Sequence, residues 1–164
     1  MTIKIKEITL GLGQLMLDPN NYRLNTGEHW KKVTDDQIVD CQQETQEKLI
    51  KENISDLETS IFENGFLEVD KIVVKELSNL TNPTNLKKYL VIEGNRRTAA
   101  FKSLINEYYN KNDESFDEAF PIVLREKYKS INVILVEGSD EEVEDYSQRL
   151  MGIRHVSAPR QWGG

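Results

Sequence analysis

The chain has 164 residues, of which 38% are hydrophobic, and its formal net charge is −7. This length supports one domain with a substantial core and leaves little room for a second. The acidic balance excludes a surface that binds nucleic acid throughout, so any DNA contact is expected to be local or outside this sequence. Two histidines and the single cysteine, Cys41, form no disulfide or zinc pattern. Because no apolar run reaches the length of a bilayer span, we expect a soluble, cytoplasmic protein with no membrane partner.

The first half of the chain contains one predicted strand, a rigid turn and a polar stretch. Residues 3–10 alternate between apolar and polar side chains, which predicts a strand. The Asp-Pro-Asn-Asn sequence at 18–21 favours a tight turn, because proline restricts φ and Asp and Asn side chains bond nearby backbone. This turn places Arg23 directly after a rigid loop. Residues 25–46 are polar and are interpreted as a surface insertion that is partly helical near 35–41.

Helices and strands are predicted at several further places along the chain. Apolar residues recur at helical spacing between Leu49 and Phe62, and Asn64-Gly65 provides a stop, which predicts one helix of about four turns. The β-branched runs within 69–77 and 131–136 predict strands, with a hairpin-like loop at 78–88. Ser139 followed by Glu142 predicts a capping box for a helix over 140–151, with acidic residues at its positive end.

The most informative stretch lies at residues 89–105, which predict a buried strand, a sharp turn at Gly94 and a helix that continues to about Tyr109. The first turn of a helix has backbone N–H groups without intrahelical partners, and the helix dipole favours an anion there. Arg96 and Arg97 oppose that dipole unless something negative is bound. These residues indicate a phosphate site. The alternative is that both arginines are solvated or paired with acids of this acidic chain.

Four motifs, in the same order along the chain, resemble those of the ParB/sulfiredoxin superfamily. Residues 93–100, Glu-Gly-Asn-Arg-Arg-Thr-Ala-Ala, resemble its Gly-Glu-Arg-Arg-x-Arg-Ala box. Residues 17–23 resemble the first box, a Pro-Asn loop that ends in arginine, and residues 61–67 resemble a helix end that leads into a strand. Residues 154–162 are similar to the Arg-His-x-Ser-Gly-x-x-x-Trp string of ParB-like relatives. The resemblance implies an α/β (α+β) fold, with a small mixed sheet flanked by helices.

The same resemblance implies a domain organisation and a nucleotide pocket. Residues 1–152 would form a ParB-like domain, and residues 153–164 would begin a further C-terminal segment that is truncated here. In ParB proteins the pocket binds CTP with magnesium. Carried over to this sequence, the nucleotide and phosphate contacts would come from Arg23, Gly94, Asn95, Arg96, Arg97, Thr98, Ala99, Arg154 and His155. Arginine suits this role because its planar guanidinium binds phosphate oxygens at two points.

Two departures from the family pattern bear on the chemistry. Asn95 stands where ParB proteins have glutamate and where sulfiredoxins have their reacting cysteine, which excludes sulfiredoxin activity. Arg154 and His155 replace a Glu-Asn pair that holds magnesium in ParB, and they are poor ligands for that cation. The expected cofactor is therefore a nucleoside triphosphate, CTP or ATP, with Mg²⁺ left open and no metal site assigned to protein residues.

The resemblance leaves more than one function open. The first interpretation is a nucleotide-binding module that serves DNA-associated machinery, with a role as a slow NTPase switch left open. Glu93 is a candidate general base, although structural capping explains it equally well. The alternative is a DNA-binding or nuclease-like domain whose arginines contact DNA phosphate directly, but no cluster of carboxylates accompanies the arginines as metal-dependent cleavage requires. The partners expected are a nucleotide and DNA, with homodimerisation open.

Overall fold

A mixed β-sheet forms the centre of the computed structural model, which describes residues 2–21, 24, 32–51, 54–66, 71–77 and 86–152. Its strands have the spatial order β1-β7-β3-β4-β2. They are β1 (Lys4–Leu10), β2 (Leu15–Met16), β3 (Ile72–Glu76), β4 (Tyr89–Glu93) and β7 (Ile131–Glu137). The β1/β7 and β3/β4 pairs are antiparallel, whereas β3/β7 and β2/β4 are parallel. The predicted small mixed sheet is confirmed.

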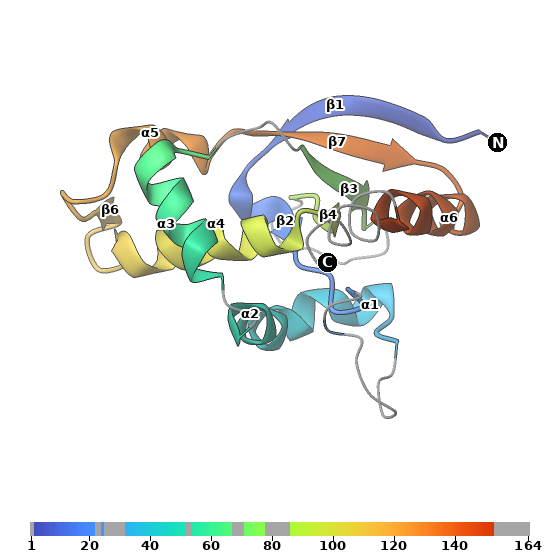
Figure 1. The fold of residues 1–164 in the computed structure, drawn as a ribbon, viewed down its shortest axis with the longest axis horizontal. Helices are drawn as coiled ribbons and strands as arrows, with labels where there is room; N and C mark the ends of the chain where they lie inside the picture. The colour runs from blue at the N-terminus through green and yellow to red at the C-terminus, as the bar shows by residue number, and fades with distance from the viewer. Residues whose placement is uncertain are drawn as a thin grey trace, which may run out of the picture.

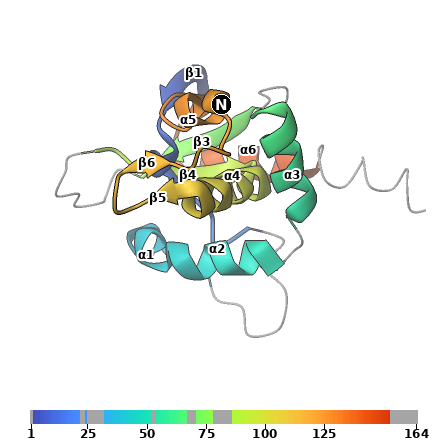
Figure 2. The same cartoon turned by 90° about the vertical axis from the view of Figure 1, so that its left-hand side faces the viewer.

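Helices cover the sheet, and a small hairpin lies beyond it. The helices are α1 (Asp35–Ile38), α2 (Gln42–Lys51), α3 (Ser55–Asn64), α4 (Asn95–Tyr108), α5 (Ile122–Lys127) and α6 (Asp140–Met151). Short 3-10 turns occur at η1 (Leu12–Gln14) and η2 (Val39–Cys41), and β5 (Tyr109–Asn110) pairs with β6 (Ser115–Phe116). Figures 1 and 2 show α1 and α2 along the bottom of the molecule, below α4, with β1 and α5 at the top.

The two faces of the sheet pack against different helices, as the alternation of side chains along a strand requires. Val74, Val91 and Val133 belong to the main core, together with residues of α3, α4 and α5. Val73 and Val136 point to the opposite face and pack with Val143 of α6. Each central strand therefore buries both of its faces, which explains why β3 and β4 read as continuous apolar runs in the sequence.

The predicted single helix over residues 49–64 is wrong, because the structure has two helices there. α2 ends at Lys51, and α3 begins after Ile54, whose φ and ψ angles are −96° and 8°. Leu49, Ile54 and Ile61 are all buried, and both helices pack against α4. Apolar residues therefore recur at helical spacing on both sides of the break, because two successive helices each bury an apolar face against α4.

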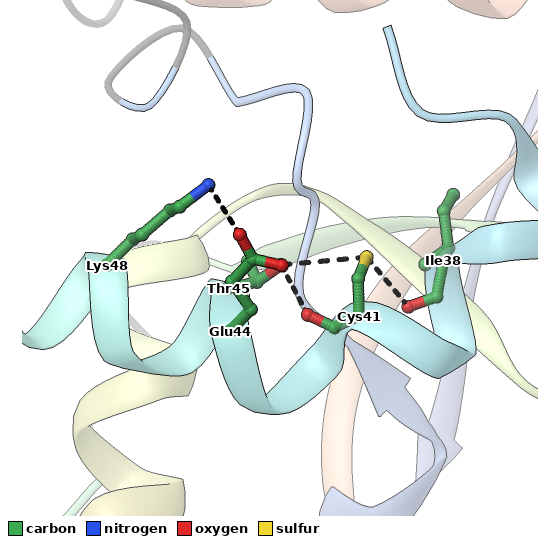
Figure 3. Close-up of polar contacts among 5 residues, drawn as sticks. All are labelled: Ile38, Cys41, Glu44, Thr45 and Lys48. Atoms are coloured by element: carbon green, nitrogen blue, oxygen red, sulfur yellow. Dashed lines mark hydrogen bonds and ion pairs between the residues drawn. The ribbon is translucent and has the colours of Figure 1, made fainter. Parts of the chain in front are cut away.

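The predicted polar insertion at 25–46 is described from residue 32 onward, and it is helical from Asp35. Its Ile38 and Thr45 are buried, so this part of the segment covers the core. Cys41 is half-buried within it, where its thiol donates to Ile38 O at 3.4 Å and its carbonyl accepts the Thr45 hydroxyl at 2.9 Å (Figure 3). Cys41 is thus held by helix-internal contacts. The predicted C-terminal segment at 153–164 lies outside the described residues.

Candidate functional site

The turn between β4 and α4 is built on Gly94. Its φ of +101° and ψ of 20° lie in the left-handed region, which residues with a Cβ rarely adopt. A Cβ at this position would lie 3.0 Å from Ile72 Cγ1 of the neighbouring strand. Glycine is therefore needed for two reasons, its backbone angles and the close approach of β3. This confirms the predicted order of strand, sharp turn and helix.

The first turn of α4 has no side-chain cap and no acidic residue. Its first intrahelical hydrogen bond runs from Thr98 N to Gly94 O at 2.9 Å, so the amides of residues 95–97 precede that bond. Amides in this position carry the positive end of the helix dipole. Arg96 and Arg97 add two full positive charges to the same turn. The start of α4 is therefore electrostatically suited to an anion.

A cavity of about 780 Å³ lies at the start of α4, over the face of the sheet that packs against α6. Leu90 and Ile92 of β4 and Lys75 of β3 line it from the sheet. The loop at 18–21 and residues 32 and 35 line one part of it, and one face of α6 (Asp140–Met151) lines another. The site therefore combines an apolar surface on β4 with polar walls from three separate stretches of chain, as small-molecule sites commonly do.

Charges of both signs line this cavity. The cationic residues are Lys32, Lys75, Arg96 and Arg97, and the acidic residues are Asp18, Asp35, Glu93, Asp140, Glu141 and Glu144. Lys75 Nζ lies 3.5 Å from Asp35 Oδ2. The arginines belong to the start of α4, whereas three of the acids belong to the start of α6. Glu93 and Asp18 lie beside the start of α4 as well, so an anionic group in the cavity would be attracted by the arginines and repelled by acids on more than one wall.

Aromatic packing places one of the two arginines. The guanidinium carbon of Arg97 lies 4.9 Å from the centre of the Phe66 ring, a cation–π distance. Phe66 is itself stacked on Phe101 of α4, with ring centres 4.8 Å apart. Both rings are buried. The Arg97 side chain thus rests on a rigid aromatic surface, which restricts the positions that its charged end can take.

Asp18 provides an unusual carboxyl group in the cavity wall. Its Oδ1 accepts the backbone N–H of Asn20 at 2.9 Å, and its own N–H donates to Asn95 Oδ1 at 2.8 Å. Burial raises the pKa of Asp18 to about 6, and the Asn20 N–H and the charge of Lys75 oppose that rise. Burial dominates because a carboxylate loses more solvation than these two partners restore.

The structure brings together only some of the residues predicted to bind nucleotide. Gly94, Asn95, Arg96 and Arg97 line the cavity, as does Glu93. Thr98 and Ala99 are completely buried and do not line it, and the Thr98 hydroxyl donates to Gly94 O at 2.8 Å. Arg23, Arg154 and His155 lie outside the described residues. The phosphate-binding role of the set remains a prediction.

Sequence reasoning missed the wall that α6 contributes. Asp140, Val143, Glu144, Ser147 and Gln148 line the cavity from successive turns of that helix. Their spacing of three or four residues places them on one helical face, so the signal was present. The pattern did not predict a cavity wall, because the positive end of the helix dipole already accounts for acidic residues at the start of a helix.

No metal site emerges from the described residues, which contain no group of three or more His, Cys, Asp or Glu side chains able to hold an ion. The acids of the cavity are therefore dispersed along its walls, and magnesium is assigned no ligands here. Within the same residues, no helix is long and apolar enough to cross a bilayer.

Comparison with known proteins identifies the class of domain. The sequence model of the ParB N-terminal domain matches residues 20–111, which is more than half of the chain. The chain belongs to the ParB N-terminal domain family. This confirms the resemblance seen in the motifs, two of which, the arginine box and the helix end at 61–67, fall inside the matched range. No curated protein sequence matches the chain.

Two solved structures are similar in outline. One is a Pnob8-like ParB-N domain, with 11% identity and a TM-score of 0.48, over 94% of this chain and 39% of that one. The other is a C-terminally truncated chromosome-partitioning protein ParB from Caulobacter crescentus, complexed with CTP-gamma-S, with 15% identity and a TM-score of 0.44. It is matched over 93% of this chain and 54% of its own. The chain thus spans about half or less of each solved chain, and the family assignment rests on the sequence model.

Proposed function

We propose that this domain binds a nucleoside triphosphate, with the phosphates at the start of α4 and the nucleoside over Leu90 and Ile92. One observation carries the proposal: a helix that begins at a glycine, with no cap and with two arginines in its first turn, opens into a cavity of about 780 Å³. Backbone amides at a helix start and guanidinium groups are the usual donors to phosphate. The apolar surface of β4 offers packing for a base or a ribose.

Each group of residues has its own part in the proposed nucleotide site. The backbone amides of residues 95–97 and the guanidinium groups of Arg96 and Arg97 contact phosphate. Arg23, Arg154 and His155 are proposed to complete the site from segments that the structure does not describe. Thr98 and Ala99 support it from behind, because both are buried under the turn. CTP is the first nucleotide to test, because the similar Caulobacter crescentus protein was solved with CTP-gamma-S.

Thermal unfolding in the presence of CTP, ATP, GTP or pyrophosphate, each with and without Mg²⁺, tests the proposal. A ligand at a hundredfold excess over its Kd adds about 2.7 kcal/mol of stability, which raises Tm by roughly 5–10 °C in a chain of this size. Arg96→Ala and Arg97→Ala should each remove most of that shift. Arg149→Ala is the matched control, because Arg149 is exposed on α6, paired with Asp145 at 3.1 Å and away from the cavity. A wild-type protein that none of these ligands shifts would reject the proposal.

Hydrolysis and a role on DNA are further parts of the same proposal. Glu93 lines the cavity directly before Gly94, so Glu93→Gln should abolish any phosphate release that the wild-type protein shows with CTP or ATP. Direct contact between the arginines and DNA is the competing function. The acids along the cavity oppose it, because a duplex would carry many phosphates past them. Salt-sensitive DNA binding that Arg96→Ala removes, without any effect of nucleotide, would favour that alternative.

A further inference from the structure

The side chain of Asn95, the first residue of α4, is buried beside the cavity. It is only 4% exposed, and both ends of its amide are bonded. The oxygen Oδ1 accepts the backbone N–H of Asp18 at 2.8 Å, and Nδ2 donates to Val91 O at 3.0 Å. An acceptor on one side and a donor on the other fix the orientation of the amide. The group has therefore a defined partner at each end and is not directed at a ligand.

The two partners of Asn95 belong to different walls of the cavity. Val91 lies in β4, one residue from the lining residues Leu90 and Ile92, and Asp18 begins the loop at 18–21. Asn95 itself is the first residue of α4. A single side chain thus connects the sheet, the first turn of the arginine helix and a loop 77 positions earlier in the sequence. Hydrogen bonds of this kind are strong in a buried place and costly to lose singly.

A second side-chain amide, that of Gln42, holds the residue that directly precedes this loop. Gln42 of α2 accepts Leu17 N–H at 2.6 Å through Oε1 and donates to Leu17 O at 2.8 Å through Nε2. Gln42 does not line the cavity, and Leu17 is buried. Gln42 therefore secures the approach to the loop, whereas Asn95 secures its contact with the phosphate-binding turn. The chain offers two amide anchors of similar chemistry, only one of which touches the site.

We propose that Asn95 is a positioning residue: its amide holds the loop at 18–21 against the first turn of α4, so that loop and turn form one preorganised wall of the anion site. This inference rests on the proposed function and adds to it a side chain that acts on the site without touching the ligand. Preorganised donors bind better because no binding energy is spent on ordering them. Asparagine is required, since aspartate cannot donate to Val91 O while ionised, and alanine leaves Asp18 N–H and Val91 O without their partner.

Isothermal titration calorimetry with CTP and with inorganic pyrophosphate tests the inference, alongside Tm values for each variant. Asn95→Ala and Gln42→Ala should both lower Tm, but only Asn95→Ala should weaken binding, by about tenfold or more. Amide hydrogen exchange without ligand should accelerate at Asp18 in Asn95→Ala alone. Unchanged affinity in Asn95→Ala, or an equal loss in Gln42→Ala, would overturn the inference. Absence of binding by the wild-type protein would instead overturn the proposed function, and this inference with it.

Asn95→Asp provides a second measurement, which also serves if Asn95→Ala does not fold. A protonated aspartic acid is nearly isosteric with asparagine and regains both an acceptor and a donor. Its affinity relative to wild type at the same pH should therefore be reduced at pH 8 and recover toward the wild-type value at pH 5.5. Comparison at equal pH removes the titration of the ligand from the result, and repeating the comparison in an Asp18→Asn background removes that of Asp18. A relative affinity that is independent of pH, or that falls at pH 5.5, would contradict the positioning role.

Discussion

Two helices begin at the same cavity, and their first turns are built in opposite ways. α6 begins with a complete capping box, in which the Ser139 hydroxyl accepts Glu142 N–H and the Glu142 carboxylate accepts Ser139 N–H, each at 3.2 Å. α4 begins at a glycine, without a cap, and has two arginines where α6 has acids. A capped, acidic first turn suits the positive end of its own helix dipole, whereas a basic, uncapped first turn adds positive charge there and favours an anion. The comparison therefore agrees with the proposed anion site at α4 and gives α6 the part of a structural wall in that proposal.

Gly94→Ala should produce the largest loss of stability, because it affects the helix start that lacks a cap. Alanine would be strained at a φ of +101°, and its Cβ would meet Ile72 Cγ1 at 3.0 Å. We expect the free energy of unfolding to fall by about 2–3 kcal/mol, measured by urea denaturation. Gly13→Ala is the control: nothing lies within 4 Å of its added Cβ, and the change should stay within about 1 kcal/mol. Equal effects at both glycines would refute the strain assigned to Gly94.

Asp18→Asn tests the buried carboxyl in the cavity wall whose backbone N–H bonds the first residue of α4. Because burial raises the pKa of Asp18 to about 6, the folded protein binds more protons than the unfolded chain between about pH 4 and 6. The free energy of unfolding of the wild-type protein therefore falls as pH rises from about 4 through 6, because the buried Asp18 loses its proton. Asp18→Asn should be more stable than wild type at pH 7.5 by on the order of 2 kcal/mol, and equal to it near pH 4. A difference in unfolding free energy that does not change with pH would contradict the burial of this carboxyl.

Ser139→Ala removes the cap that distinguishes α6 from α4. Loss of an N-cap hydroxyl costs about 1 kcal/mol of stability, which chemical denaturation measures directly. Binding of CTP or pyrophosphate should remain within about twofold of wild type, because Ser139 does not line the cavity. If this variant lost nucleotide binding as completely as Arg96→Ala, the distinction between the two helix starts would fail.

Glu142→Gln should have the smallest effect, which is present near neutral pH and disappears in strong acid. Hydrogen bonds from the backbone N–H groups of Thr2 and Ser139, and then from their hydroxyls, lower the pKa of Glu142 to about 2. Its folded pKa lies below the unfolded value, so its contribution to stability is complete above about pH 4.5 and is lost as pH falls toward 2. The difference in Tm between wild type and Glu142→Gln should shrink over that range. A constant difference between pH 5 and 2 would show that these bonds do not favour the carboxylate.

A few neighbouring residues were enough to predict the two helix starts that border the cavity. The capping box at Ser139 and Glu142 and the turn at Gly94 were predicted from a few adjacent residues, and both are present. These signals succeed because capping and left-handed turns depend on side chains within four positions. The spacing from Leu49 to Phe62 correctly indicated an apolar face that packs on α4, but it wrongly predicted one helix. The number of helices depends on the bend of the chain at Ile54, which the spacing of apolar residues does not encode.

The sequence by itself determined several of the strands and helices, the glycine turn and the pair of arginines at the start of α4, because each is encoded by neighbouring residues. The α/β class followed from the resemblance to ParB-like domains. Only the tertiary structure decided that the amide of Asn95 meets the backbone of Asp18, that Arg97 rests on Phe66, and that the acidic face of α6 closes the cavity. Such contacts join residues tens of positions apart, and their geometry is set by how the helices pack on the two faces of the sheet. No local pattern specifies that packing.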